Sequence, residues 1–133
     1  MRILLGIRDR DLQLALQLML TEVPNYDIVG TTRTATGLLA LLKASQVDLV
    51  ILDHDLSDKQ TPDFITKIKN CVSNPRVILI GMDDTSPQTV SEIGSDAYLS
   101  KYEPPDRFVT TIRRIFMENI DKTENQVKEN SSS

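Results

Sequence analysis

Five short apolar runs, separated by stretches with helical spacing, constrain the fold of this chain more than any other feature. Most residues within each run are apolar, without the polar alternation of a half-exposed strand. Such strands are typical of a parallel sheet that is covered by helices on both faces. The predicted strands cover residues 3–7, 28–30, 49–52, 77–80 and 97–99.

Helical periodicity fills the stretches between these runs. The clearest helix start is the third, where Thr61, Pro62 and Asp63 combine a capping hydroxyl, a proline at the first helical position and an acid. Helices are predicted over residues 11–21, from Thr34, over 61–68, from Ser86 to Gly94 and from Pro104 through Phe116.

The alternation of strands and helices predicts a doubly wound α/β domain with a five-stranded parallel sheet. In such sheets the functional site lies beyond the carboxyl ends of the strands. The third run, VDLVILDHD, stops at Asp53, and Asp55 follows two residues later. We interpret Asp53 as stopping the strand because the strand ends at the site.

Composition narrows the class of protein. The chain has 133 residues, enough for one domain, and 15 basic against 19 acidic residues give a net charge of -4. This negative net charge argues against a domain that binds nucleic acid through the electrostatic field of the whole protein. No apolar run reaches membrane-spanning length, and the N-terminus does not match a signal peptide. The single cysteine, Cys71, excludes an intramolecular disulfide, which fits a cytoplasmic protein, and we interpret it as a small buried hydrophobic residue.

Together, the strand ends resemble the receiver domain of two-component response regulators. The resemblance rests on the third strand ending in Asp53 and on Gly94-Ser-Asp-Ala-Tyr-Leu-Ser-Lys101, in the order and spacing of the β/α alternation. The stretch 101–105 is most similar to receivers that precede a helix-turn-helix output domain. The resemblance implies a (βα)5 flavodoxin-like fold over residues 1–119, followed by a polar tail or linker over 120–133.

Several residue roles follow from the resemblance. It places the phosphoacceptor position at Asp53, the lysine that contacts phosphoryl oxygens at Lys101, and the switch aromatic at Tyr98. It also implies a homodimer through the fourth helix, fifth strand and fifth helix, where Arg113 and Arg114 either pair across the dimer or form a solvated face. A sensor kinase or another signalling protein is the implied partner. DNA would be bound only by an attached output domain, and no membrane is involved.

Three features depart from the receiver pattern. An ungapped reading places the acidic pair that binds Mg²⁺ on Ile7 and Arg8, and neither side chain can supply the hard oxygen ligands that this ion prefers. Gly81 stands where receivers carry a hydroxyl residue that follows the phosphoryl group. The stretch between the fourth and fifth strands is also about two residues short, so a truncated or reshaped fourth helix is expected.

These departures predict a receiver that does not depend on phosphorylation. A guanidinium can bond a carboxylate through two parallel hydrogen bonds. We therefore predict that Arg8 and Lys101 clamp Asp53, in a pocket that also includes Asp9 and Gly81. No metal, no cofactor and no enzymatic activity are expected from this interpretation.

Two alternatives remain at this point. The chain could be a conventional receiver that is phosphorylated on Asp53 and uses Mg²⁺, with relocated ligands such as Asp9, Asp55 or Asp83. Asp9 is also, and by preference, interpreted as a helix cap. More remotely, Asp53-His-Asp55 is similar to the nucleophile motif of haloacid-dehalogenase-type phosphatases, in which the first acid attacks phosphate and the second acts as general acid.

Overall fold

A parallel five-stranded sheet organises the chain in the computed structural model, which describes residues 1–56, 61–81, 94–104 and 106–117. A further helix covers residues 106–117. The elements, in order, are β1 (Arg2–Gly6), α1 (Arg10–Thr21), β2 (Asp27–Thr32), α2 (Ala35–Ala44), β3 (Leu49–Asp53), the 3-10 turn η1 (His54–Leu56), α3 (Thr61–Lys69), β4 (Arg76–Gly81) and β5 (Ala97–Ser100).

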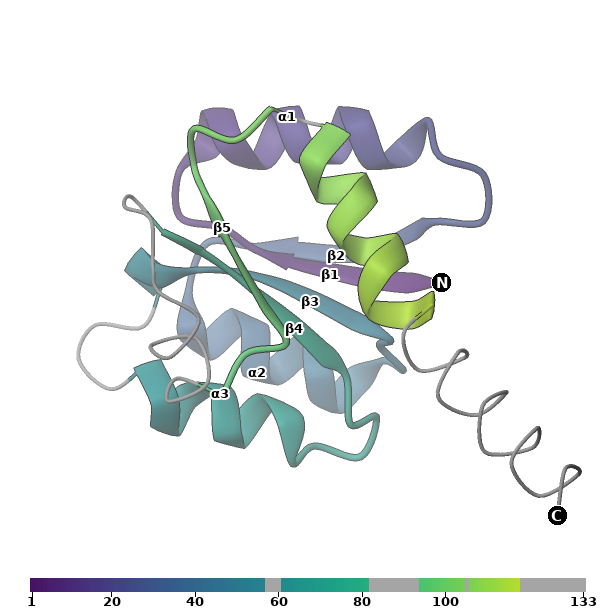
Figure 1. Ribbon diagram of the computed structural model, residues 1–133. Helices are drawn as coiled ribbons and strands as arrows, with labels where there is room; N and C mark the ends of the chain where they lie inside the picture. Colours follow the sequence, from purple (N-terminus) through teal and green to yellow (C-terminus); the bar gives the residue numbers. More distant parts are fainter. Residues whose placement is uncertain (57–60, 82–93, 105, 118–133) are drawn as a thin grey trace, which may run out of the picture. The chain divides into compact units, whose positions relative to one another are not determined.

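The strand order is β2-β1-β3-β4-β5, with every neighbouring pair parallel. Helix α1 covers one face of the sheet, and α2 and α3 cover the other (Figure 1). This arrangement confirms the predicted doubly wound, flavodoxin-like fold. The register pairs Gly6 with Leu52, Asp53 with Ile80, and Gly81 with Ser100. The residues that leave β1, β3, β4 and β5 therefore meet at one edge of the sheet.

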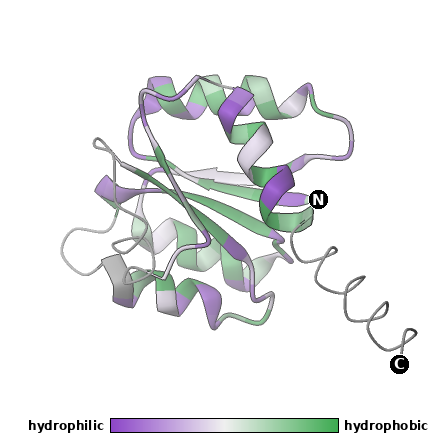
Figure 2. Cartoon of the chain, viewed as in Figure 1, coloured by the Kyte–Doolittle hydropathy of each residue, from purple (hydrophilic) through white to green (hydrophobic). Residues whose placement is uncertain are grey.

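The interior strands β3 and β4 are apolar on both faces of the sheet. Residues 49–52 of β3 and 77–80 of β4 are fully buried. Figure 2 shows these strands as the hydrophobic centre between helices of mixed character. Burying one such Leu or Ile side chain stabilises a fold by about 1.5–3 kcal/mol. A rigid sheet core therefore supports the residues at the strand ends.

Local hydrogen bonds fix where the helices begin. The side chain of Asp9 accepts the main-chain N–H groups of Asp11 and Leu12 and caps α1, and Thr34 caps α2 by accepting the N–H of Gly37. The structure thus shows the capping role that we preferred for Asp9. Helix α3 begins at Thr61 itself, one residue earlier than a capping role for Thr61 predicts.

Strand β2 is longer than its apolar run. It extends from Asp27 to Thr32 instead of over residues 28–30, and the whole strand is half-buried or exposed because it lies at the sheet edge. Polar Thr31 and Thr32 still pair with Leu5 and Gly6. The search for apolar runs missed these two threonines, because an edge strand is held by main-chain pairing and its side chains need not be buried.

Contacts divide the chain into two compact units, residues 1–103 and 104–133. The sheet and α1 to α3 belong to the first unit, and the helix over residues 106–117 belongs to the second. The predicted helix from Ser86 to Gly94, with its expected truncation, lies almost wholly outside the described residues, and so does the predicted tail. Within the described part of the chain, no helix is long and apolar enough to cross a membrane.

Candidate functional site at the strand ends

Asp53 ends β3 as a fully buried carboxylate. Its Oδ2 accepts the main-chain N–H of Arg8 at 3.2 Å, and its Oδ1 accepts the main-chain N–H of Asp55 at 3.1 Å. The first contact arises because β1 and β3 are neighbours and end at the same level. The second arises because the η1 turn folds the chain back over the strand end, a local pairing that Asp side chains favour.

Lys101 brings a positive charge to this carboxylate from the residue after β5. Its Nζ lies 3.7 Å from Oδ1 of Asp53 and 3.2 Å from Oδ2 of Asp55. The main-chain N–H of Lys101 donates to the carbonyl of Gly81 at 2.8 Å, which holds the residue beside β4. One ammonium is therefore shared between a buried and an exposed carboxylate.

The charge of Lys101 is stabilised despite its burial. Desolvation of the ammonium acts to lower the pKa of Lys101, but the hydrogen bond that it donates to Asp55 and the negative charges of Asp53, Asp55 and Asp9 outweigh this effect and raise the pKa above 10.5. The site thus keeps a fixed cation at neutral pH.

Arg8 contacts the site through both its main chain and its side chain. Its main-chain N–H binds Asp53, whereas Nη1 of its guanidinium donates to the main-chain carbonyl of Asp55 at 3.4 Å. The carbonyl of Arg8 in turn accepts Nε of Arg33 at 3.1 Å. Among these contacts of Asp53, Lys101 supplies the ionic part, and the main-chain N–H groups of Arg8 and Asp55 supply the hydrogen bonds. The Arg8 side chain is exposed and Ile7 takes the buried position after β1, and a guanidinium clamp on Asp53 stays a prediction.

The side chains that follow β1 offer few oxygen donors beside Asp53. Ile7 is fully buried and offers no oxygen, and Asp9 uses Oδ1 to cap α1. Among the described residues, no group of three or more His, Cys, Asp or Glu side chains is placed to hold a metal ion. Mg²⁺ needs oxygen ligands in near-octahedral geometry. The relocated ligand Asp83 lies outside the described residues.

Gly81 and Tyr98 interlock at the ends of β4 and β5. A Cβ added to Gly81 would overlap the hydroxyl oxygen of Tyr98 and would lie 2.8 Å from its Cζ. Tyr98 is half-buried, and its ring packs against the core cluster under α2 and α3. The phenol therefore occupies the space that any side chain at position 81 would need. The sequence named both residues but gave no signal that they meet.

Asp96 is a residue whose role the sequence did not reveal. Its carboxylate accepts Nζ of Lys69 at 2.9 Å, Nη1 of Arg76 at 3.2 Å and the main-chain N–H of Val77 at 2.8 Å. The main-chain N–H of Asp96 also donates to the carbonyl of Val77. These bonds join α3, the start of β4 and the approach to β5. They fix the strand that carries Tyr98 and leads to Lys101.

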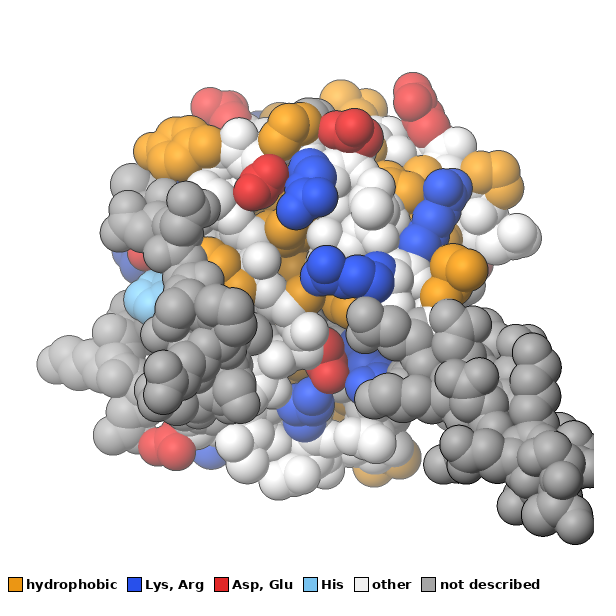
Figure 3. Space-filling model, viewed as in Figure 1, with side chains coloured by type: hydrophobic (Ala, Val, Ile, Leu, Met, Phe, Trp, Pro, Cys, Tyr) orange, Lys and Arg blue, Asp and Glu red, His pale blue; other side chains and the backbone are white. Residues whose placement is uncertain are grey.

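The helix over residues 106–117 carries the two arginines of the predicted interface. Phe108, Ile112 and Ile115 share one buried face at helical spacing, whereas Arg113 and Arg114 are exposed. Their pairing across a dimer stays a prediction. On the face in Figure 3, basic side chains are interspersed with acidic, apolar and uncharged ones instead of forming one continuous basic surface.

Comparison with known protein families decides the identity of this arrangement. The profile described as response regulator receiver domain matches residues 8–113. The chain belongs to the response regulator receiver family. A receiver domain of this family acts in two-component signalling, and the match spans Asp53, Gly81, Tyr98 and Lys101. Comparison with curated proteins gave no match.

Solved structures of other receivers share the fold. The signal receiver domain of NarL from Mycobacterium tuberculosis is 20% identical, with a TM-score of 0.72 over 84% of this chain and 91% of its own. A DNA-binding response regulator of the LuxR family from Staphylococcus aureus is 19% identical, with a TM-score of 0.71 over 86% and 97%. RcsB from Salmonella enterica serovar Typhimurium, bound to promoter rprA with the phosphomimetic BeF3-, is 17% identical, with a TM-score of 0.73 over 86% and 67%. At these identities the likeness concerns the fold alone.

Proposed function

We propose that this receiver domain signals through protein–protein contact without phosphorylation of Asp53. One observation carries the proposal: the buried carboxylate of Asp53 already has the N–H groups of Arg8 and Asp55 and the ammonium of Lys101 around it. A buried charge is costly unless it is paired and hydrogen-bonded. Here both requirements are met by groups of the chain itself.

Phosphoryl transfer onto Asp53 would lack its usual electrostatic support. The reaction depends on positioning and on neutralising the charge of the moving oxygens, and a metal ion supplies much of that neutralisation. Near Asp53, Ile7 replaces an oxygen ligand with an alkyl group, and Lys101 divides its charge between Asp53 and Asp55. Acceptance at Asp53 is therefore expected to be very slow. We assign no catalytic residue and no resident cofactor.

The pair of Gly81 and Tyr98 supports the same proposal. Gly81 has no hydroxyl that could follow a phosphoryl group, and the phenol of Tyr98 fills the space beside it. The position of this ring then depends on packing and not on a side chain at position 81. We propose that this packed ring belongs to a single signalling-competent form of the domain.

The proposed contact surface lies on β5 and on the last helix. We place Tyr98, Arg113 and Arg114 on it, together with the segment predicted as the fourth helix, nearly all of which lies outside the described residues. The proposed partner is a second copy of this chain, and a sensor kinase or another signalling protein acts upstream in the cytoplasm. The printed description of the Staphylococcus aureus relative as DNA-binding favours control of an attached helix-turn-helix output domain.

Incubation with a small phosphodonor and Mg²⁺ tests the proposal. Intact-protein mass spectrometry is expected to show no phosphoryl adduct, and BeF3- with Mg²⁺ is expected to leave the amide resonances of residues 53–56 unmoved. The matched control is the double variant Ile7→Asp, Arg8→Asp, which restores two carboxylates and should gain a Mg²⁺-dependent response. A stoichiometric, Mg²⁺-dependent adduct on Asp53 in the unaltered chain would overturn the proposal.

A further inference from the structure

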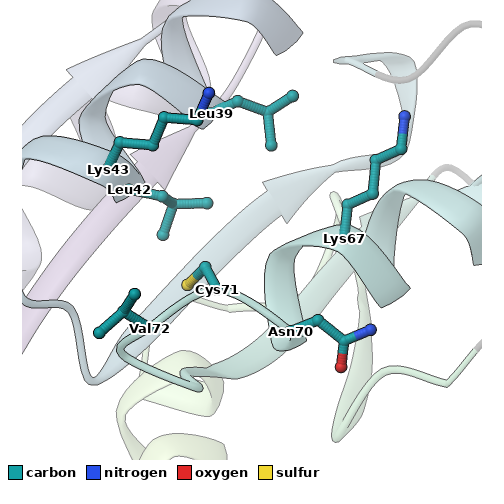
Figure 4. A pocket seen from close by; sticks show the side chains of 7 residues that line it. All are labelled: Leu39, Leu42, Lys43, Lys67, Asn70, Cys71 and Val72. Carbon is teal, nitrogen blue, oxygen red and sulfur yellow. The ribbon is translucent and has the colours of Figure 1, made fainter.

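A second concave region lies between α2 and α3, away from Asp53. We call it the α2–α3 cavity; its volume is about 500 Å³, within the range of small-molecule sites. Its walls are the last two turns of α2, the end of α3 and the turn after α3 (Figure 4). Because α2 and α3 lead into the starts of β3 and β4, the cavity lies near the end of the sheet opposite Asp53.

The cavity combines an apolar floor with an exposed apolar rim. Leu42 is 3% exposed, Leu39 is half-buried, and Val72 is fully exposed at one end. In Figure 4 the side chains of Leu42 and Cys71 point into the space between the two helices. An aliphatic chain laid over these groups would remove apolar surface from water, at about 25 cal/mol per Å².

Two lysines give the cavity its charge. The described residues include four lysines, of which Lys69 and Lys101 form ion pairs with acids. Lys43 and Lys67 have no acidic partner among the described residues, and both line the α2–α3 cavity, whose lining contains no acidic residue. Their ammonium groups lie toward the same end of the cavity, away from Val72 (Figure 4). The unpaired lysines of the described chain thus coincide with its apolar cavity.

We propose that the α2–α3 cavity binds a small amphipathic anion: an aliphatic chain that ends in a carboxylate or phosphate. We place the anionic head between Lys43 and Lys67, so that either ammonium group could donate a charge-assisted hydrogen bond to it. The chain would cover Leu39, Leu42 and Val72. This site is independent of the proposed phosphate-free signalling, because it shares no residue with the Asp53 pocket.

Cys71 provides a built-in probe for this ligand. It is the only cysteine of the chain and lines the cavity as a half-buried side chain. The sequence predicted a small buried hydrophobic residue, and the structure shows Cys71 only half-buried, because it borders the cavity. Titration with decanoate should slow alkylation of Cys71 by N-ethylmaleimide in a saturable manner. Decyltrimethylammonium, which has the same chain and the opposite charge, should give no saturable protection.

Single substitutions at the lysines complete the test. Lys43→Gln and Lys67→Gln should each weaken decanoate binding several-fold, and the double variant should weaken it by about tenfold or more. Arg10→Gln is the matched control, because it removes an exposed cation from α1, on the other face of the sheet, and should leave the affinity unchanged. Both lysines are exposed, so thermal melts of the variants should match that of the unaltered chain.

Three results would overturn the proposal. Equal protection by decanoate and decyltrimethylammonium would indicate a detergent effect without an anion site. Decanoate protection that is unchanged in the double lysine variant would place the ligand elsewhere. Saturable protection by an acidic peptide but not by decanoate would assign the cavity to a protein partner. Because phosphorylation of Asp53 enters none of these measurements, the outcome does not depend on the proposed function.

Discussion

Two carboxylates, Asp53 at the end of β3 and Asp96 just before β5, are both held by basic side chains but in different ways. Asp96 receives two cations at 2.9 and 3.2 Å and a main-chain N–H at 2.8 Å. Asp53 is more deeply buried, yet its one cation lies at 3.7 Å and is shared with Asp55. Asp96 therefore joins three segments as a structural link. Asp53 has a single cation, shared with Asp55, so its ionic support depends on Lys101.

Of the changes that test this comparison, removing the Lys101 ammonium should lower the free energy of unfolding the most. Lys101→Met leaves the fully buried Asp53 without its cation, and the loss of one partner of a buried pair costs about 3 kcal/mol. Urea unfolding should show this decrease in the free energy of unfolding. Lys67→Met, which removes an exposed lysine without an acidic partner among the described residues, is the control and should be nearly neutral. A neutral Lys101→Met would mean that the main-chain N–H groups alone stabilise Asp53.

Asp96→Asn should destabilise somewhat less, by about 2 kcal/mol, because Asp96 is partly accessible to water and an amide keeps one acceptor for the N–H of Val77. Chemical unfolding measures the loss, and added salt should reduce the difference from the unaltered chain. If Asp96→Asn proved costlier than Lys101→Met, the ranking of the two carboxylates would be reversed.

Gly81→Ala should cost about 1–2 kcal/mol, because the new Cβ overlaps the hydroxyl of Tyr98. Tyr98→Leu removes the hydroxyl and the outer part of the ring and should make the same Gly81→Ala substitution better tolerated. A double-mutant cycle by urea unfolding measures this coupling. Strict additivity would show that the two side-chain positions do not compete for space.

The pH dependence should be the smallest effect. The pKa of Lys101 is raised in the folded state, so its contribution to stability is fully present below pH 10.5 and is lost as the pH rises through the folded-state pKa. The free energy of unfolding of the unaltered chain should therefore fall more steeply above pH 10.5 than that of Lys101→Met. Parallel curves for the two proteins would contradict this linkage.

The sequence predicted the sheet and the meeting of Asp53 with Lys101, because apolar strands force burial and parallel strands end at one edge. It did not predict how Arg8 contacts Asp53. The direction of a side chain after a strand is set by the local turn and by the competing burial of Ile7, and strand patterning does not specify either. The close packing of Tyr98 against Gly81 was also missed, since a glycine in the sequence does not indicate which side chain fills the space beside it.

The partners of Asp96 escaped prediction for a related reason. Lys69 and Arg76 come from separate elements, α3 and β4, and their approach to Asp96 depends on how the turn between them packs. Cross-element pairs of this kind arise only after the core has formed. In contrast, the cap at Asp9 could be inferred, because its partners follow within three residues.

Titration of Mg²⁺ into the unaltered chain, followed by amide NMR, tests the central claim most directly. The account predicts that the amide resonances of Arg8, Asp53 and Asp55 stay in place, and that they shift with Mg²⁺ in the Ile7→Asp, Arg8→Asp variant. Saturable Mg²⁺-dependent shifts at these three residues in the unaltered chain would contradict it, and would identify the pocket as that of a metal-dependent receiver.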